Sequence, residues 1–477
     1  MRPRHLPLCF AALVGLLTPV AASAQNRPAP RPPAAPAAAP AATTRLEIPV
    51  TRERLENGLR VVLSPDHSVP TVAVAVYYDV GARVEEQGRS GFAHLFEHLM
   101  FEGTEGLPKG EFDRLLALRG ADANATTSED RTNYYETLPA SSIELGLFLE
   151  ADRMRALAIT AEAFENQRLT VMEERRQSYE NRPYMLSVLE RDRLFYAGYY
   201  PYEHSTIGDM ADLQRATLAD VRAFHARYYA PDNAVIAITG DFEPAAAMEL
   251  VRRHFGPITA RRGAPWTDPG YTPPGQERAQ AMVDPLADAP AFHMVWHIPP
   301  RRTEDHYALE LLGSILGGGE SSRLHQRLVR TREMLAEVEV GAEGRRGPDM
   351  FALWAICAGE NRPVDVRREV DAIIAEVISG GVTAQELQKA KNARRAGFVF
   401  GLESPLGRAE YLGMTELYDG DAGLVNTELA RYEAVTVDDV RRVAGRYLTA
   451  QNRLVLDVLP RGATTSSLQE VMGRYGW

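Results

Sequence analysis

The chain has few cysteines, no long apolar run in its body and no excess of basic residues. Only two of its 477 residues are cysteines, Cys9 and Cys357. Cys9 lies in a segment that we expect to be removed, and one remaining thiol cannot form an internal disulfide, so a packed core must hold the fold. Beyond that segment no apolar run reaches the roughly 18 residues that a membrane-spanning helix needs. The net charge of −11 is unfavourable for nucleic-acid binding.

The N-terminus predicts export. Arg2 and Arg4 give a basic start, residues 6–17 form a short apolar core, and Ala22-Ser23-Ala24 fits an A-x-A cleavage site. We therefore expect a signal peptide over residues 1–24 and an exported protein, periplasmic in a Gram-negative bacterium. Its removal takes away two arginines, which moves the net charge from −11 to −13. Residues 25–44 are rich in Pro and Ala and predict a disordered lead-in.

The rest of the chain predicts two related halves. The stretch Thr217–Tyr228, followed by Asn233 and an apolar run, matches Thr436–Tyr447, followed by Asn452 and an apolar run, at a constant offset of 219 residues. Tandem duplication explains such a repeat better than chance does.

The expected domains follow from this repeat. We expect a first domain over 45–256, and a second, homologous domain without metal ligands over 285–462. Residues 257–284 are rich in Pro, Gly and Arg without periodicity, which predicts a linker. Residues 463–477 form a short tail.

The first half contains a compact metal-binding motif, His94-Leu-Phe-Glu-His98. In a helix the two histidines lie one turn apart on one face, where both imidazoles can bind one zinc ion at about 2.0–2.1 Å. Glu97 borders the same face and could take a proton from water. The apolar neighbours also allow a core helix with no metal. However, burying three unpaired polar groups costs several kcal/mol, which favours the metal site.

Two further segments are candidates for the site. Residues 121–138 read as two strands and a turn, and an edge strand there could bind a substrate backbone by strand addition, although an ordinary solvated hairpin fits the composition equally well. On the long helix expected over 161–180, Gln167 and Glu174 share one stripe. Spacing alone does not separate Glu174 from its neighbour Glu173.

These residues resemble the pitrilysin family of zinc peptidases, which includes insulin-degrading enzyme and the mitochondrial processing peptidase. The resemblance rests on residues 94–98, on Val171-Met-Glu-Glu174 and on the duplicated halves, and it spans about residues 45–460. It implies an α+β fold of two homologous halves, each a mostly antiparallel sheet packed with helices, together forming half of a clamshell. The family's third ligand follows the second histidine by about 76 residues, which selects Glu174 over Glu173.

The family resemblance also implies the chemistry. We expect a zinc-dependent endopeptidase that hydrolyses peptides or unfolded segments bound in extended form. His94, His98 and Glu174 would hold one Zn²⁺ per chain, and Glu97 would act as general base. The substrate strand maps onto Asn124, Ala125 and Thr126. The alternative is a non-catalytic assembly or peptide-binding subunit of the same fold.

The chain departs from the family pattern at two positions, one near the metal ligands and one in the second half. Gln167 stands where the family commonly has a glutamate, so it supplies no charge. In the second half Arg330 fits the family's arginine, but Glu337 stands where a tyrosine is expected, and an ionised carboxylate cannot donate to an oxyanion. The chain thus resembles the zinc-bearing subunit of a heterodimer whose homologous partner carries the Arg/Tyr pair. A homodimer remains open.

Overall fold

The computed structural model describes residues 47–260 and 266–462. The expected signal peptide, the Pro/Ala-rich segment 25–44 and the tail 463–477 lie outside the described residues. No helix within the described ranges is long and apolar enough to cross a membrane.

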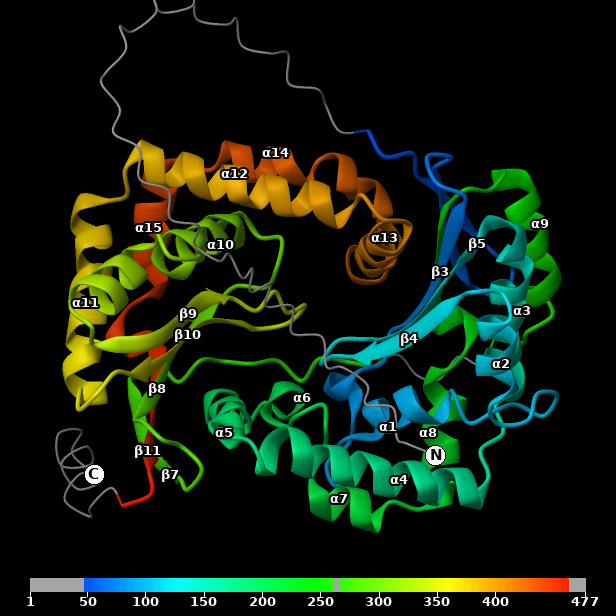
Figure 1. The fold of residues 1–477 in the computed structure, drawn as a ribbon, viewed down its shortest axis with the longest axis horizontal. Helices are drawn as coiled ribbons and strands as arrows, with labels where there is room; N and C mark the ends of the chain where they lie inside the picture. Colours follow the sequence, from blue (N-terminus) through cyan, green and yellow to red (C-terminus); the bar gives the residue numbers. More distant parts are fainter. Residues whose placement is uncertain (1–46, 261–265, 463–477) are drawn as a thin grey trace, which may run out of the picture. The chain divides into compact units, whose positions relative to one another are not determined.

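The first half is built on a six-stranded sheet (Figure 1). Only the pair β2/β6 is parallel, and all other neighbours are antiparallel. The strands, in their order across the sheet, are β1 (Thr51–Arg54), β2 (Arg60–Pro65), β6 (Ala234–Gly240), β3 (Thr71–Tyr78), β5 (Thr132–Pro139) and β4 (Asp122–Thr127). Strand β4 therefore forms one edge of the sheet, as expected for residues 121–138.

The second half repeats this topology with five strands. One parallel pair, β7/β11, is followed by antiparallel neighbours. The order is β7 (Arg278–Asp284), β11 (Arg453–Pro460), β8 (Ala291–Ile298), β10 (Asp349–Cys357) and β9 (Leu335–Ala342). The expected α+β architecture of two mostly antiparallel sheets with helices is confirmed.

Strand β7 lies inside the stretch 257–284, whose lack of periodicity predicts a linker and gives no sign of a strand. Its sequence lacks a clear alternation, and its hydrogen bonds come from parallel pairing with β11, about 175 residues further along the chain. Such a distant pairing leaves no local signal. The domain boundaries themselves stay a prediction.

Helices flank both sheets. Those of the first half are α1 (Phe92–Leu99), α2 (Glu111–Ala117), α3 (Ile143–Ala156), α4 (Ala161–Arg175), α5 (Met185–Phe195), α6 (Tyr200–Glu203), α7 (Met210–Arg215), α8 (Leu218–Tyr228) and α9 (Pro244–Phe255). Those of the second half are α10 (Glu304–Gly317), α11 (Pro363–Gly380), α12 (Ala384–Gly401), α13 (Pro405–Asp419), α14 (Glu428–Ala434) and α15 (Val437–Tyr447). Short π-helical turns follow α4 at Arg176–Glu180 and precede β9 at His325–Thr331.

The repeat seen in the sequence recurs in the local geometry. Helices α8 and α15 both begin with a capping box, in which the Thr217 and Thr436 side chains accept from the third residue of each helix. After each helix an asparagine amide donates to the carbonyl of the helix's final tyrosine, at 2.9 Å for both Asn233 and Asn452. Equivalent residues therefore close equivalent turns in the two halves.

One helix of each half packs against the sheet of the other half. Helix α13 of the second half packs on β3 and β6, as Figure 1 shows, and α5 of the first half packs beside β7 and β11. A Cβ at Gly413 in α13 would lie 2.7 Å from the Tyr77 ring, so this close approach needs glycine. At the end of α5, the Phe195 ring stacks on His297 of β8 at 3.9 Å. The two halves are thus interlocked rather than simply adjacent.

The apolar core of the first half includes the helix that carries the histidine motif. Phe92, Leu95, Phe96 and Leu99 of α1 are at most 1% exposed, so one side of this helix is fixed by packing.

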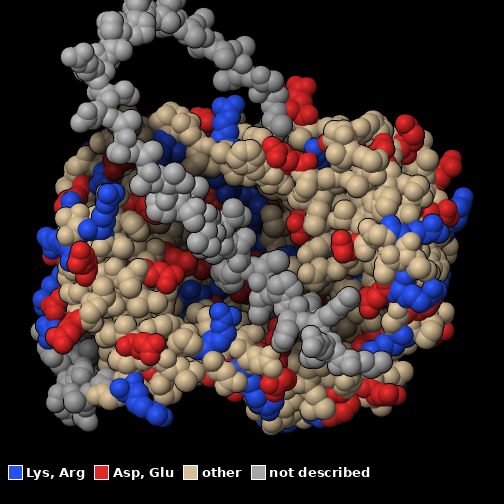
Figure 2. Space-filling view, in the orientation of Figure 1, with Lys and Arg blue, Asp and Glu red and all other residues tan. Residues whose placement is uncertain are grey.

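On the face of the molecule in Figure 2, acidic and basic side chains are interspersed and no single sign dominates.

Candidate metal centre

Three metal-binding side chains of the first half converge at one point. His94 and His98 lie one turn apart on α1, and Glu174 comes from the last turn of α4, which packs against α1. Their donor atoms all lie within 4.8 Å of one another. The Glu174 Oε2 atom is 3.7 Å from His94 Nε2 and 3.3 Å from His98 Nε2. Ligand atoms on a tetrahedral zinc ion are about 3.3 Å apart, so this donor set fits the metal.

The surroundings favour the metal-binding form of His94, a neutral imidazole, and of Glu174, a carboxylate. Burial lowers the pKa of His94, and the nearby His98 lowers it further, which favours the neutral imidazole that binds metals. Burial also acts against charge on His98 and Glu174, and it is the largest single influence on each pKa. The hydrogen bond between the two side chains and the groups around them together outweigh burial, so the pKa of His98 is raised and that of Glu174 is lowered. Glu174 is therefore held as a carboxylate beside two imidazoles.

The structure separates Glu174 from its neighbour Glu173. The Glu173 side chain is 53% exposed, and it accepts hydrogen bonds from Arg176 at 3.2 Å and Gln177 at 3.0 Å. It faces away from the imidazoles because adjacent residues of a helix point about 100° apart.

Glu97 lies beside the ligand group and is held by the edge strand. Its Oε2 atom accepts a hydrogen bond of 2.6 Å from the hydroxyl of Thr127, the last residue of β4. Sequence reasoning placed Thr127 at the end of the substrate strand but did not predict its contact with Glu97, because the hydrogen bond joins two elements 30 residues apart. The hydroxyl fixes the Glu97 carboxylate without neutralising it.

The expected substrate strand lies at an open sheet edge. Among the described strands, β4 pairs only with β5. Ser128 N donates to Arg131 O at 2.9 Å where the hairpin closes. Hydrogen-bonded pairs alternate along an antiparallel ladder, so the main-chain N–H and C=O of Ala125 face the open side, where the N–H donates to Asn124 Oδ1 at 2.9 Å. Asn124 and Thr126, its neighbours, turn their main chains toward β5.

Gln167 stands where the family commonly has a glutamate, and the neighbouring carboxylate of Glu102 partly makes up for the missing negative charge. The Gln167 amide donates to Glu102 Oε1 at 2.5 Å and also lies within hydrogen-bonding reach of His98. Glu102 is in turn paired with Lys109 at 2.6 Å. The Gln167 amide thus stands between the Glu102 carboxylate and His98. The negative charge of Glu102 lies further from the imidazole than the carboxylate of a glutamate at position 167 would lie.

A buried carboxylate caps the start of the metal-binding helix. Glu85 accepts hydrogen bonds from the backbone N–H groups of Gly91 at 2.8 Å and Ala93 at 2.7 Å. Its Oε2 atom also lies 2.9 Å from His204 Nε2. Burial raises the pKa of Glu85, while His204 and the two amides counteract part of that shift. Because Gly91 has no side chain, Glu85 supplies the cap that orients α1.

We expect Glu85→Gln to destabilise the fold by about 1–3 kcal/mol, because a glutamine turns an NH₂ group toward one of the two buried amides. The measurement is the free energy of unfolding by denaturant. The matched control is Glu86→Gln, since Glu86 is 60% exposed with surface ion pairs to Arg89 and Arg227. Its change should stay within about 0.5 kcal/mol. Equal losses in the two variants would contradict the capping role.

The second-half candidates lie elsewhere. Arg330 is exposed on the π-helical turn before β9, and Glu337 is exposed on β9, opposite Ile356 of β10. Among the described residues, neither makes a hydrogen bond or ion pair with His94, His98 or Glu174.

Comparison with known proteins matches both halves to one family. The family model "Insulinase (Peptidase family M16)" matches residues 60–200, and the model "Peptidase M16 inactive domain" matches residues 215–394. The histidine motif and Glu174 lie in the first of these segments.

Relatives and solved structures agree with this match. A zinc protease of Helicobacter pylori, PqqE, is 31% identical over 399 residues, which cover 82% of this chain and 89% of that protein. An uncharacterized zinc protease of Mycobacterium tuberculosis is 30% identical, over 89% of this chain and 96% of that one.

The crystal structure of a protease from Helicobacter pylori superposes with a TM-score of 0.81 at 28% identity, over 87% of this chain and all of that one. The periplasmic protease PqqL of Escherichia coli has the same fold, with a TM-score of 0.71 at 18% identity, over 91% of this chain but 51% of that one. From its two matched domains, its relatives and its fold, the chain belongs to peptidase family M16, the insulinase or pitrilysin-like family.

Proposed function

We propose that this chain is a zinc-dependent endopeptidase that hydrolyses peptides or unfolded protein segments bound in extended form. One observation carries the proposal: three metal donors converge beside Glu97, next to an edge strand with an open side. Relatives named zinc proteases support it. The N-terminal sequence alone supports export.

The residues of the site have separate proposed roles. His94, His98 and Glu174 would hold zinc, which supplies Lewis-acid activation of water and of the scissile carbonyl when bound. Glu97 takes the proton from the attacking water and passes it to the leaving amine. Thr127 keeps the Glu97 carboxylate oriented through its 2.6 Å hydrogen bond. The main chain of Ala125 pairs with the substrate backbone as an added strand.

The alternative is a non-catalytic subunit. It rests on the match of residues 215–394 to the inactive-domain model. That segment holds none of the three metal donors or Glu97, so the match concerns the half that we already expect to lack a metal site.

We further propose a homologous partner subunit. Glu337 stands where the family resemblance calls for a tyrosine that donates to the substrate, and a carboxylate has no proton to donate at neutral pH. The partner would carry the Arg/Tyr pair that completes the site, in a heterodimer. A homodimer would leave both sites without the tyrosine.

The test is zinc content and turnover of a fluorogenic peptide by the purified chain, with and without the companion subunit that co-purifies with it. We expect one zinc per chain, turnover that is lost on chelation and restored by zinc, and a rate that rises at least tenfold with the companion. Absence of zinc-dependent turnover in both samples would contradict the peptidase. Full turnover by the isolated chain would contradict only the partner.

A further inference from the structure

We propose that the second half, although it lacks metal donors, positions the general base of the first half through Asp130. The contact is made by the loop of residues 343–348, which joins β9 to β10 and is called the 343–348 loop below. The inference rests on the proposed function, and it makes Asp130 and the 343–348 loop positioning elements for Glu97.

The 343–348 loop binds the tip of the β4–β5 hairpin through Asp130. The Arg346 backbone N–H donates to Asp130 Oδ2 at 2.9 Å. The Tyr202 hydroxyl donates to Asp130 Oδ1 at 2.8 Å and accepts from the Gly347 N–H at 2.9 Å. Asp130 is only 5% exposed and Tyr202 1%. Both carboxylate oxygens of the buried Asp130 therefore accept hydrogen bonds where the loop meets the hairpin. A change in the geometry of this junction would cost free energy.

Charge pairs reinforce the same junction. The Arg346 guanidinium lies 2.6 Å from Asp79 Oδ1, just after β3. Arg83 lies 3.3 Å from Asp130 and 3.6 Å from Asp79. Arg83 of the first half therefore pairs with both aspartates, and Arg346 of the second half adds a second ion pair to Asp79.

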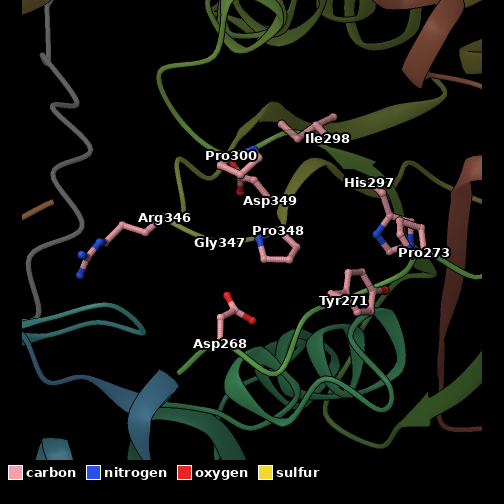
Figure 3. Close-up of a pocket in the computed structure, with 10 residues that line it drawn as sticks. All are labelled: Asp268, Tyr271, Pro273, His297, Ile298, Pro300, Arg346, Gly347, Pro348 and Asp349. Carbon is pink, nitrogen blue, oxygen red and sulfur yellow. The ribbon is translucent and has the colours of Figure 1, made fainter. Parts of the chain in front are cut away.

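Part of the 343–348 loop faces a pocket, although the Tyr196 hydroxyl donates to Pro348 O at 2.9 Å and Arg345 is buried beside Asp192. Gly347 and Pro348 line a pocket of about 370 Å³, and Figure 3 shows the Arg346 side chain pointing away from the other residues of that pocket. The loop therefore has open space on the side of the pocket, and the contacts with Asp130 and Tyr202 help to fix its position on the side of the hairpin.

The hairpin tip connects directly to the general base. Thr127, which donates to Glu97, is three residues from Asp130 and ends the strand whose turn Asp130 occupies. A shift of the tip moves the Thr127 hydroxyl and releases the Glu97 carboxylate. The metal donors come from α1 and α4 instead, so zinc binding should not change. A misplacement of about 1 Å at a catalytic group can cost about 100-fold in rate.

The test compares two glycine substitutions in one hairpin. A Cβ at Gly347 would lie 2.9 Å from the Tyr202 hydroxyl oxygen, so Gly347→Ala pushes Tyr202 away from Asp130. Gly341→Ala in β9 is the matched control, because a Cβ there meets nothing within 4 Å. A milder variant, Tyr202→Phe, removes only the bridging hydroxyl and guards against misfolding.

We measure kcat, KM, zinc content and amide hydrogen exchange in residues 122–132. Gly347→Ala and Tyr202→Phe should lower kcat about tenfold, leave KM within twofold and zinc content unchanged, and speed exchange in the hairpin. Gly341→Ala should match the wild type. In a Thr127→Val background, where Glu97 has already lost its donor, Gly347→Ala should lower kcat by less than twofold more.

Each other outcome has a definite meaning. If Gly347→Ala leaves amide hydrogen exchange in the hairpin unchanged, or speeds it without lowering kcat, this inference is overturned but the proposed function is not. The same holds if the losses of kcat from Gly347→Ala and Thr127→Val are fully additive. Loss of zinc in Gly347→Ala would show a general structural role and overturn it too. A wild-type chain that binds zinc but hydrolyses no peptide, with or without its companion subunit, would overturn the proposed function, and this inference with it.

Discussion

Replacing Glu97 by glutamine should lower kcat for peptide hydrolysis by about 10²–10⁴-fold while zinc content stays at one per chain. The amide keeps the size of the side chain and can still accept from the Thr127 hydroxyl, which lies 2.6 Å from Glu97 Oε2. It cannot take a proton from water at neutral pH, so the loss falls on the chemical step. The measurements are steady-state kinetics and metal analysis of the same preparation.

The control for this substitution is Glu105→Gln, a change of the same type at an exposed glutamate seven residues after His98. It should leave kcat within twofold of the wild type. If Glu97→Gln also retains full turnover, the carboxylate is not the general base. If neither protein hydrolyses peptides yet both bind them, a peptide-binding role is correct.

Replacing Glu174 by glutamine should weaken zinc binding by more than 100-fold. Loss of a residue that merely supports a ligand typically costs 10–100-fold, and a direct ligand should exceed that range. A neutral amide is a weak zinc donor, and the two imidazoles alone leave the ion with two protein ligands. Competition with a chelating dye gives the affinity, and turnover at limiting zinc should fall in parallel.

Glu173→Gln is a stringent control, because it makes the same change one residue away. Glu173 points to solvent and pairs with Arg176 and Gln177. Its substitution should leave zinc affinity unchanged within twofold. Equal affinities for the two variants would show that Glu174 does not bind the metal, and the proposed peptidase would lose its third ligand.

Local sequence patterns predicted much of the scaffold. The 219-residue repeat indicated two halves, and helices α8 and α15, their capping boxes and the strands that follow keep that offset. These features depend on residues within one or two turns of each other, so the sequence carries them directly. The spacing of His94 and His98 is of the same kind, because one helical turn fixes it.

Contacts between distant segments were not predictable in this way. Strand β7 looked aperiodic because its pairing partner, β11, comes about 175 residues later. The exchange of α5 and α13 between the halves has no local signature either, beyond the glycine at 413 that permits the approach. Such features depend on which surfaces meet, and the hydrophobic pattern of one helix is compatible with many partners.

By itself the sequence determined the imidazole pair, the neighbouring acid Glu97 and the duplicated scaffold, because each is set by short-range geometry. It left Glu173 and Glu174 unresolved until a family resemblance chose between them. Only the tertiary structure decided which carboxylate faces the imidazoles, which hydroxyl holds Glu97, and that Glu85 and Asp130 support the site from other segments. Hydrogen bonds between residues far apart in the chain form only after packing has brought their elements together, so no local pattern can encode them.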